Sequence, residues 1–136
     1  MLAHVLSVAA FVVVTFAVQA TNHFVINTTH YARQTIIADE PALAGGFAAM
    51  LVQGGVLTFL YSRLILLPRF SGVFGGLGFA LLMGAFLGSY VALAEPSKYL
   101  VSSRLSWFTV EATASLIQFS LFGLALGFIH KTWGAR

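Results

Sequence analysis

Four long apolar segments limit what this chain can fold into. They cover about residues 2–20, 42–61, 72–94 and 105–129, and each is close to the roughly 20 residues that an α-helix needs to cross a bilayer. In hydrocarbon, backbone N–H and C=O groups must bond to one another, which only helices and closed barrels achieve. We therefore predict an all-α integral membrane bundle of four transmembrane helices, forming a single domain over residues 1–136.

Composition supports a membrane protein and narrows its partners. Hydrophobic residues make up 59% of the chain and charged residues 8%, whereas a soluble domain is about 25% charged. The seven Lys and Arg residues are scattered singly, so the predicted partner is the lipid bilayer and not nucleic acid. Cysteine is absent, which excludes disulfides and thiolate chemistry.

The connections between the segments carry boundary signals. Asp39, Glu40 and Pro41 resemble the capping acid and first-turn proline of a helix that begins just after them. Residues 21–41 are the only long connection, so either the first helix continues past the bilayer into residues 22–31 or that stretch lies as an interfacial helix.

Orientation follows from the positive charges. Lys and Arg are slightly enriched in the second connection and after the last segment, which predicts that both termini are cytoplasmic. The small residues of Ala17–Ala20 leave a cleavable signal peptide open as an alternative. A signal peptide normally has Lys or Arg before its apolar segment, however, and this chain has neither there. Tyr31 and Trp107 fit interfacial anchors.

Small residues recur at every fourth position of the third segment. An interior glycine costs a water-soluble helix about 1 kcal/mol relative to alanine, whereas helices in lipid associate by close approach at small residues. We therefore expect these positions to pack helices together. They are Gly72, Gly76, Ala80, Gly84, Gly88 and Ala92, and Gly123 with Gly127 form a second, shorter site in the fourth segment.

Glu111 is the main candidate for a functional residue. It lies seven residues beyond Arg104, about 10 Å along a helix, where a carboxyl group should face the interior of the bundle. Ser115 and Gln118 fall on the same helical face. Polar residues follow one side of the first segment as well: His4, Ser7, Thr15, Gln19 and Asn22.

Two polar stripes of this kind have two interpretations. In the first, the stripes hydrogen-bond to each other and hold the bundle together. In the second, they line a route for a proton, an ion or a polar solute, with Glu111 as the titrating group.

Histidines are the candidate ligands for haem or a metal. His4 and His130 fall near one membrane face, and His23 and His30 near the other. Their spacing matches no ligand motif, and no zinc, phosphate-loop, nucleophile or dinucleotide pattern is present. We therefore predict no cofactor, no metal site, no catalytic residue and no enzymatic activity.

Several short motifs occur in an order that resembles small four-helix bacterial integral membrane proteins of unassigned function. They are Asn22-His23, Tyr61, Gly78-Phe79, Gly84, Trp107, Glu111, Gly123, Gly127 and Lys131. The resemblance implies four spans in a bacterial inner membrane and a role for Glu111, and it implies nothing about chemistry.

The surfaces available for interaction lead to a functional prediction. Two small-residue ridges and two polar stripes exceed what a four-helix bundle needs for folding alone. We therefore predict a non-enzymatic accessory or assembly subunit, or a homo-oligomer, packed through glycine-rich helices. The alternative is a small proton-linked transporter or channel in which Glu111 is the intramembrane titrating group.

Overall fold

The computed structural model describes residues 1–34 and 43–134, and every regular element in these ranges is helical. Four continuous helical segments are long and apolar enough to cross a membrane: Leu2–Ile26, Leu43–Leu64, Gly72–Lys98 and Arg104–Trp133. This confirms the predicted all-α class and the four spanning helices. Each segment ends a few residues later than its apolar stretch, because a helix continues into polar residues at the interface. The predicted cap at Asp39–Pro41 lies outside the described residues.

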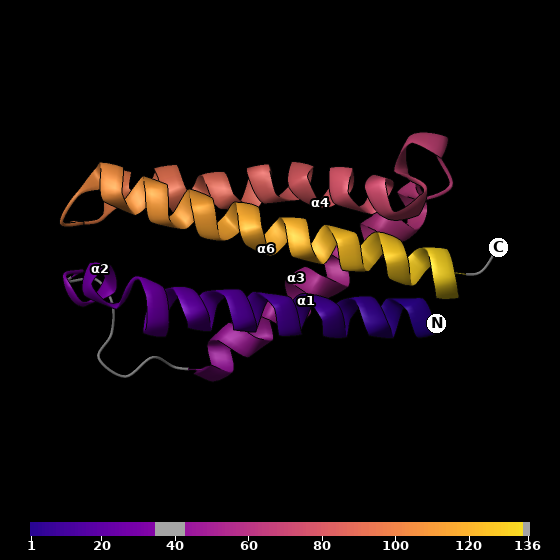
Figure 1. Cartoon of the computed structure of the whole chain (residues 1–136), viewed down its shortest axis with the longest axis horizontal. Helices are drawn as coiled ribbons and strands as arrows, with labels where there is room; N and C mark the ends of the chain where they lie inside the picture. Colours follow the sequence, from indigo (N-terminus) through magenta and orange to yellow (C-terminus); the bar gives the residue numbers. More distant parts are fainter. Residues whose placement is uncertain (35–42, 135–136) are drawn as a thin grey trace.

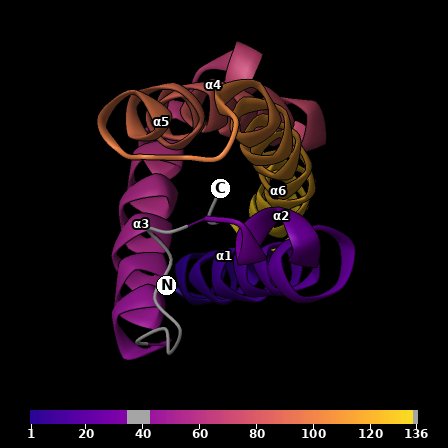
Figure 2. The same cartoon turned by 90° about the vertical axis from the view of Figure 1, so that its left-hand side faces the viewer.

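Two of the four segments change helix type near one end. The elements are α1 (Leu2–Thr21), the π-helical turn η1 (Asn22–Ile26), α2 (Thr28–Ala32), α3 (Leu43–Leu64), the 3₁₀ turn η2 (Pro68–Phe70), α4 (Gly72–Ser89), the π-helical turn η3 (Tyr90–Ala94), α5 (Glu95–Lys98) and α6 (Arg104–Trp133). The turns η1 and η3 directly precede α2 and α5, which lie at the same end of the bundle (Figure 2). The first connection thus combines both expectations, since the first helix continues through η1 and a separate short helix follows.

The four long helices form the sides of a square when the bundle is viewed end-on (Figure 2). Helices α4 and α6 lie side by side along their length and make the most extensive contact, and α6 also packs against α1 (Figure 1). Helix α3 crosses the bundle obliquely and contacts α1 more than α4. Both termini lie at one end (Figure 1), as an even number of spans requires.

Small residues bring the backbones of α4 and α6 together. A Cβ atom added at Gly76 would lie 2.5 Å from the Cα of Gly127, and one added at Gly123 would lie 2.7 Å from the Cβ of Ala80. Neither position has room for a larger side chain, because the neighbouring atoms belong to backbone or to a Cβ. The small-residue positions of the third and fourth segments thus face each other within one chain.

Gly72 has a different role from the other glycines of α4. Its φ is +70°, and a Cβ added there would meet nothing within 4 Å. Left-handed backbone favours glycine, so Gly72 serves the turn that begins α4, while its carbonyl oxygen lies against Gly127 of α6, 2.7 Å from a Cβ added there.

An aromatic core fills the middle of the bundle. It consists of Phe11, Tyr61, Phe79, Phe119 and Phe122, all buried in one hydrophobic cluster. The rings of Phe11 and Phe122 pack edge to face with centroids 4.9 Å apart. Helix α3 approaches α1 here, because Gly54 lies against Phe11, where an added Cβ would come within 3.1 Å of the ring.

Candidate functional site

A chain of short hydrogen bonds surrounds the buried carboxyl group of Glu111. The Tyr31 hydroxyl donates to Glu111 Oε1 at 2.6 Å, and the same hydroxyl accepts a hydrogen bond from Asn22 Nδ2 at 2.6 Å. Asn22 Oδ1 in turn accepts from Asn27 Nδ2 at 2.6 Å. These four side chains form the carboxyl cluster, in which Glu111 is 5% exposed.

The π-helical turn η1 positions the N-terminal half of this cluster. A π turn adds a residue to the helix and is frequently found at functional sites. The Asn27 amide bonds to the Asn22 carbonyl at 2.9 Å, and the chain leaves helical geometry at Asn27 (φ −111°, ψ 29°). The following helix, α2, carries Tyr31 to Glu111, and the ring of His23 stacks on Tyr31 with centroids 3.6 Å apart. Tyr31 is therefore held by its ring and by its hydroxyl.

Tyr31 donates the hydrogen bond that reaches Glu111. The side chain is 6% exposed, and burial raises the pKa of its hydroxyl above the ordinary value. The hydrogen bond to Glu111 and the charge of that carboxyl raise the pKa further, while the bond from Asn22 opposes them. The phenol thus stays neutral near pH 7 and supplies a hydrogen bond to Glu111.

Further contacts fasten α2 to the beginning of α6. His30 Nδ1 lies 3.0 Å from Ser106 Oγ, and Gln34 pairs with Ser102 in both directions, at 3.1 Å for each bond. Burial lowers the pKa of His30, and its Nε2 is buried without a hydrogen-bond partner. The neutral imidazole therefore suits this position better than the charged form.

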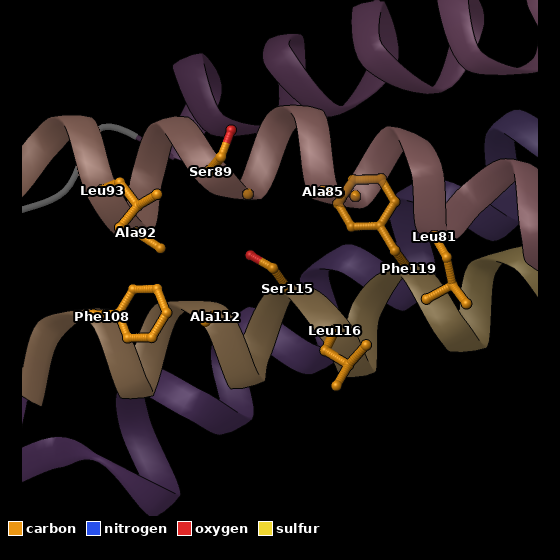
Figure 3. Close-up of a pocket in the computed structure, with 12 residues that line it drawn as sticks. Leu81, Ala85, Ser89, Ala92, Leu93, Phe108, Ala112, Ser115, Leu116 and Phe119 are labelled. Atoms are coloured by element: carbon orange, nitrogen blue, oxygen red, sulfur yellow. The ribbon is translucent and has the colours of Figure 1, made fainter.

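The two predicted polar stripes meet over part of their length. Gln19 Nε2 donates to Gln118 Oε1 at 2.9 Å, so Gln19, Asn22, Glu111 and Gln118 lie along one contact between α1 and α6. Ser115 lies apart from them and projects toward α4 (Figure 3), where a Cβ added at Gly88 would lie 3.0 Å from it. It lines a groove of about 340 Å³ between α4 and α6.

Of the remaining polar residues of α1, His4 and Ser7 are separated from Glu111 by the aromatic core. His4 lies at the other end of the bundle, where its ring centroid is 5.8 Å from that of His130. Ser7 and Thr15 are buried without hydrogen-bond partners, and the fully buried Phe11 stands between them on the same helix face. The polar stripe of α1 is thus interrupted by an aromatic side chain.

Histidines do not gather into a metal site in the part of the chain that the structure describes. Within residues 1–34 and 43–134, no group of three or more His, Cys, Asp or Glu side chains could hold a metal ion. The rings of His23 and His30 both pack against Tyr31, with centroids 3.6 and 5.1 Å from it. Their positions are accounted for by these aromatic contacts.

Sequence reasoning missed Tyr31 and Asn27 as members of the cluster. It treated Tyr31 as an interfacial anchor, because the residue follows the first apolar segment. The available signal was the run of polar and histidine residues from Asn22 to Tyr31, which is unusual directly after a spanning helix. Trp107, also treated as an anchor, donates from Nε1 to the carbonyl of Val91 in η3 at 2.9 Å.

A second candidate surface lies on α3. Its first seven residues, Leu43–Ala49, are all exposed, and Phe47 stacks on Phe16 of α1 with centroids 5.4 Å apart. Exposed residues continue along one face at alternating spacings of three and four. These residues, the α3 seam, are Gly46, Ala49, Gln53, Val56 and Leu60.

Comparisons of the chain with protein-family models, with curated proteins and with solved structures found no match.

Proposed function

We propose that this protein is a non-enzymatic assembly component of a bacterial inner membrane, which associates with a second copy of itself through the α3 seam. The observation that carries the proposal is the position of Gln53. It is the eleventh of the 22 residues of α3, in the middle of a spanning helix, and it is exposed. No other side chain within residues 1–34 and 43–134 hydrogen-bonds to it.

An exposed amide in hydrocarbon favours a helical partner. Interhelical hydrogen bonds of polar side chains contribute about 0.6 to 2 kcal/mol in membranes. A glutamine amide both donates and accepts, so two copies of Gln53 facing each other across a twofold axis satisfy one another. A twofold interface uses the same patch of both subunits, and a single polar residue in an otherwise apolar seam is a known device for setting register and oligomeric state.

The residues around Gln53 permit close approach of a second helix. Ala49 and Gly46 lie on the seam one and two turns before it, and Val56 and Leu60 follow after it. The spacing of three and four residues is that of a helix-pairing seam. A Cβ added at Gly46 would meet nothing within 4 Å among residues 1–34 and 43–134, so this small residue is not packed against that part of the chain.

The glycine ridge of α4 cannot take the same role. Gly76, Ala80 and Gly84 already face α6, so they are occupied within one chain. The α3 seam, by contrast, contains small residues that the other described residues leave exposed.

The part of the chain that the structure describes offers no comparable observation in favour of the transporter alternative. Glu111 is satisfied by Tyr31, and Phe11 with Phe122 fills the bundle between the two polar ends. A proton or solute route through one chain would need this aromatic core to move.

The substitution Gly46→Leu tests the proposal. The larger side chain fills the seam and keeps a second α3 at a distance, while the single chain has free space at this position. We expect the dimer dissociation constant to rise about tenfold or more, equivalent to about 1.4 kcal/mol. Fluorescence energy transfer between donor-labelled and acceptor-labelled copies, diluted stepwise with lipid in liposomes, measures this constant.

Ala44→Leu is the matched control. Ala44 is exposed and lies nine residues before Gln53, on the opposite side of the helix, so dimerisation should stay unchanged. Wild-type energy transfer no greater than random proximity in the bilayer gives at every dilution, or an equal loss in both variants, would refute the α3 seam. A wild type that is monomeric alone but crosslinks through position 53 to a different polypeptide would show an accessory subunit and contradict self-association.

A further inference from the structure

A polar cavity opens at the end of the bundle opposite to the carboxyl cluster. Its volume is about 520 Å³, and α1, α3, α4 and α6 all contribute to its lining. The polar and charged side chains that line it are His4, Ser62, Arg63, Ser71, His130 and Lys131. This end of the bundle also holds both termini (Figure 1), so the cavity lies where spanning helices leave the hydrocarbon.

The charged side chains that line this cavity, Arg63 and Lys131, are both positive. Arg63 belongs to the last turn of α3 and Lys131 to the last turn of α6. No Asp or Glu is among the described residues that line the cavity, and Glu95 and Glu111 belong to the opposite end of the bundle. Basic residues near helix C-termini also interact favourably with the negative end of the helix dipole. In the described residues, however, neither side chain makes an ion pair or a hydrogen bond, and Arg63 rests over the Phe59 ring.

His130 adds an unsatisfied polar group to the cavity lining. It is 6% exposed, and its Nε2 has no hydrogen-bond partner. Its ring lies between those of His4 and Tyr61, with centroids 5.8 and 5.1 Å away. A buried polar nitrogen without a partner is unfavourable, and a bound anionic headgroup that reached His130 would provide an acceptor.

Apolar side chains stand beside the cations. Phe59, Leu66 and Trp133 line the same cavity and are all largely exposed. A free anion makes no use of these groups. A phospholipid does, because its phosphate binds cations while its acyl chains lie along exposed apolar side chains.

We infer that this cavity binds the headgroup of an anionic phospholipid. The guanidinium of Arg63 and the ammonium of Lys131 bind phosphate oxygens, and arginine can do so through two parallel hydrogen bonds. Basic pockets between spanning helices are suited to such headgroups. The inference does not depend on self-association through α3, because every residue that lines the cavity belongs to a single chain.

Native mass spectrometry of the purified full chain, titrated with phosphatidylglycerol or with phosphatidylcholine, tests this inference. We expect tighter binding of phosphatidylglycerol, and a loss of that preference of about tenfold in the double variant Arg63→Gln with Lys131→Gln. The control is Lys98→Gln with Arg104→Gln, which removes the same charge at the other end of the bundle and should keep the preference. Arg63→Lys should give an intermediate result, because it keeps the charge and loses the paired hydrogen bonds.

Three outcomes would overturn the inference. The first is equal binding of the two lipids by the wild type. The second is the same loss in both double variants, which would mean general attraction to the protein's charge. The third is displacement of phosphatidylglycerol by millimolar inorganic phosphate, which would show a site for a soluble anion. A thermal unfolding curve for each variant separates weakened binding from failure to fold.

Discussion

Tyr31 links the two sides of the carboxyl cluster at the scale of single residues. Its hydroxyl accepts from Asn22 and donates to Glu111, and burial keeps it protonated by raising its pKa. One atom thus satisfies two buried partners, Asn22 in η1 and Glu111 in α6. The arrangement is sensitive to loss of that atom, because both partners are buried.

Removal of this hydroxyl by Tyr31→Phe should destabilise the protein. The variant leaves Glu111 Oε1 and Asn22 Nδ2 without their shared partner, and an unsatisfied buried group costs about 1 to 3 kcal/mol. Unfolding in a denaturing detergent titration measures the change. Tyr99→Phe is the control, since Tyr99 is 51% exposed. Equal stabilities of the two variants would show that the hydrogen bonds of Tyr31 contribute little.

At the scale of elements, the pairing of α4 with α6 is the closest in the molecule. It depends on positions where two backbones meet, such as Gly76 against Gly127. The beginning of α3 shows the opposite situation, since no described atom lies within 4 Å of a Cβ added at Gly45 or Gly46. Glycine content alone therefore does not identify which helix surface is used within the chain.

Adding a single methyl group at a packed or an open glycine tests this difference. Gly76→Ala places a Cβ 2.5 Å from the Cα of Gly127, so α4 and α6 must move apart, and we expect a destabilisation of about 1 to 3 kcal/mol. Gly78→Ala, two residues away, meets nothing within 4 Å and should be neutral or slightly stabilising. Thermal unfolding in detergent compares the two. A Gly76→Ala variant as stable as Gly78→Ala would mean that the close approach is not needed.

The whole molecule has polar ends and an aromatic middle. The carboxyl cluster and the contacts of α2 close one end, the basic cavity occupies the other, and Phe11 with Phe122 separates them. Its stability is therefore expected to respond to pH at the end where α2 meets α6, because partial burial of His30 there lowers its pKa.

Acidification should lower the stability of the protein through His30. Because the folded-state pKa lies below the ordinary value, the unfolded chain binds the proton first as the pH falls through about 6.5. The contribution of His30 is complete above that pH and is lost below it. We expect the melting temperature to fall between about pH 7.5 and about pH 5.5, and to fall less in His30→Gln. Parallel pH profiles would rule out His30 as the cause.

The sequence by itself determined the class and the number of helices. Both depend on local properties, namely the length of each apolar stretch and the periodicity of its residues, so the four spans could be predicted, as could the inward position of Glu111. The opposing small residues Gly76, Gly84, Gly123 and Gly127 were also visible as a pattern, although not which of them would meet.

Only the tertiary structure decided which residues share a site and which surface stays open. Tyr31 reaches Glu111 because η1 and α2 redirect the chain, and Ser115 turns to α4 although it lies one turn from Glu111. The exposure of Gln53 follows from the oblique path of α3 across the bundle. Such relations depend on distances between residues far apart in the chain, and periodicity along one helix carries no information about them.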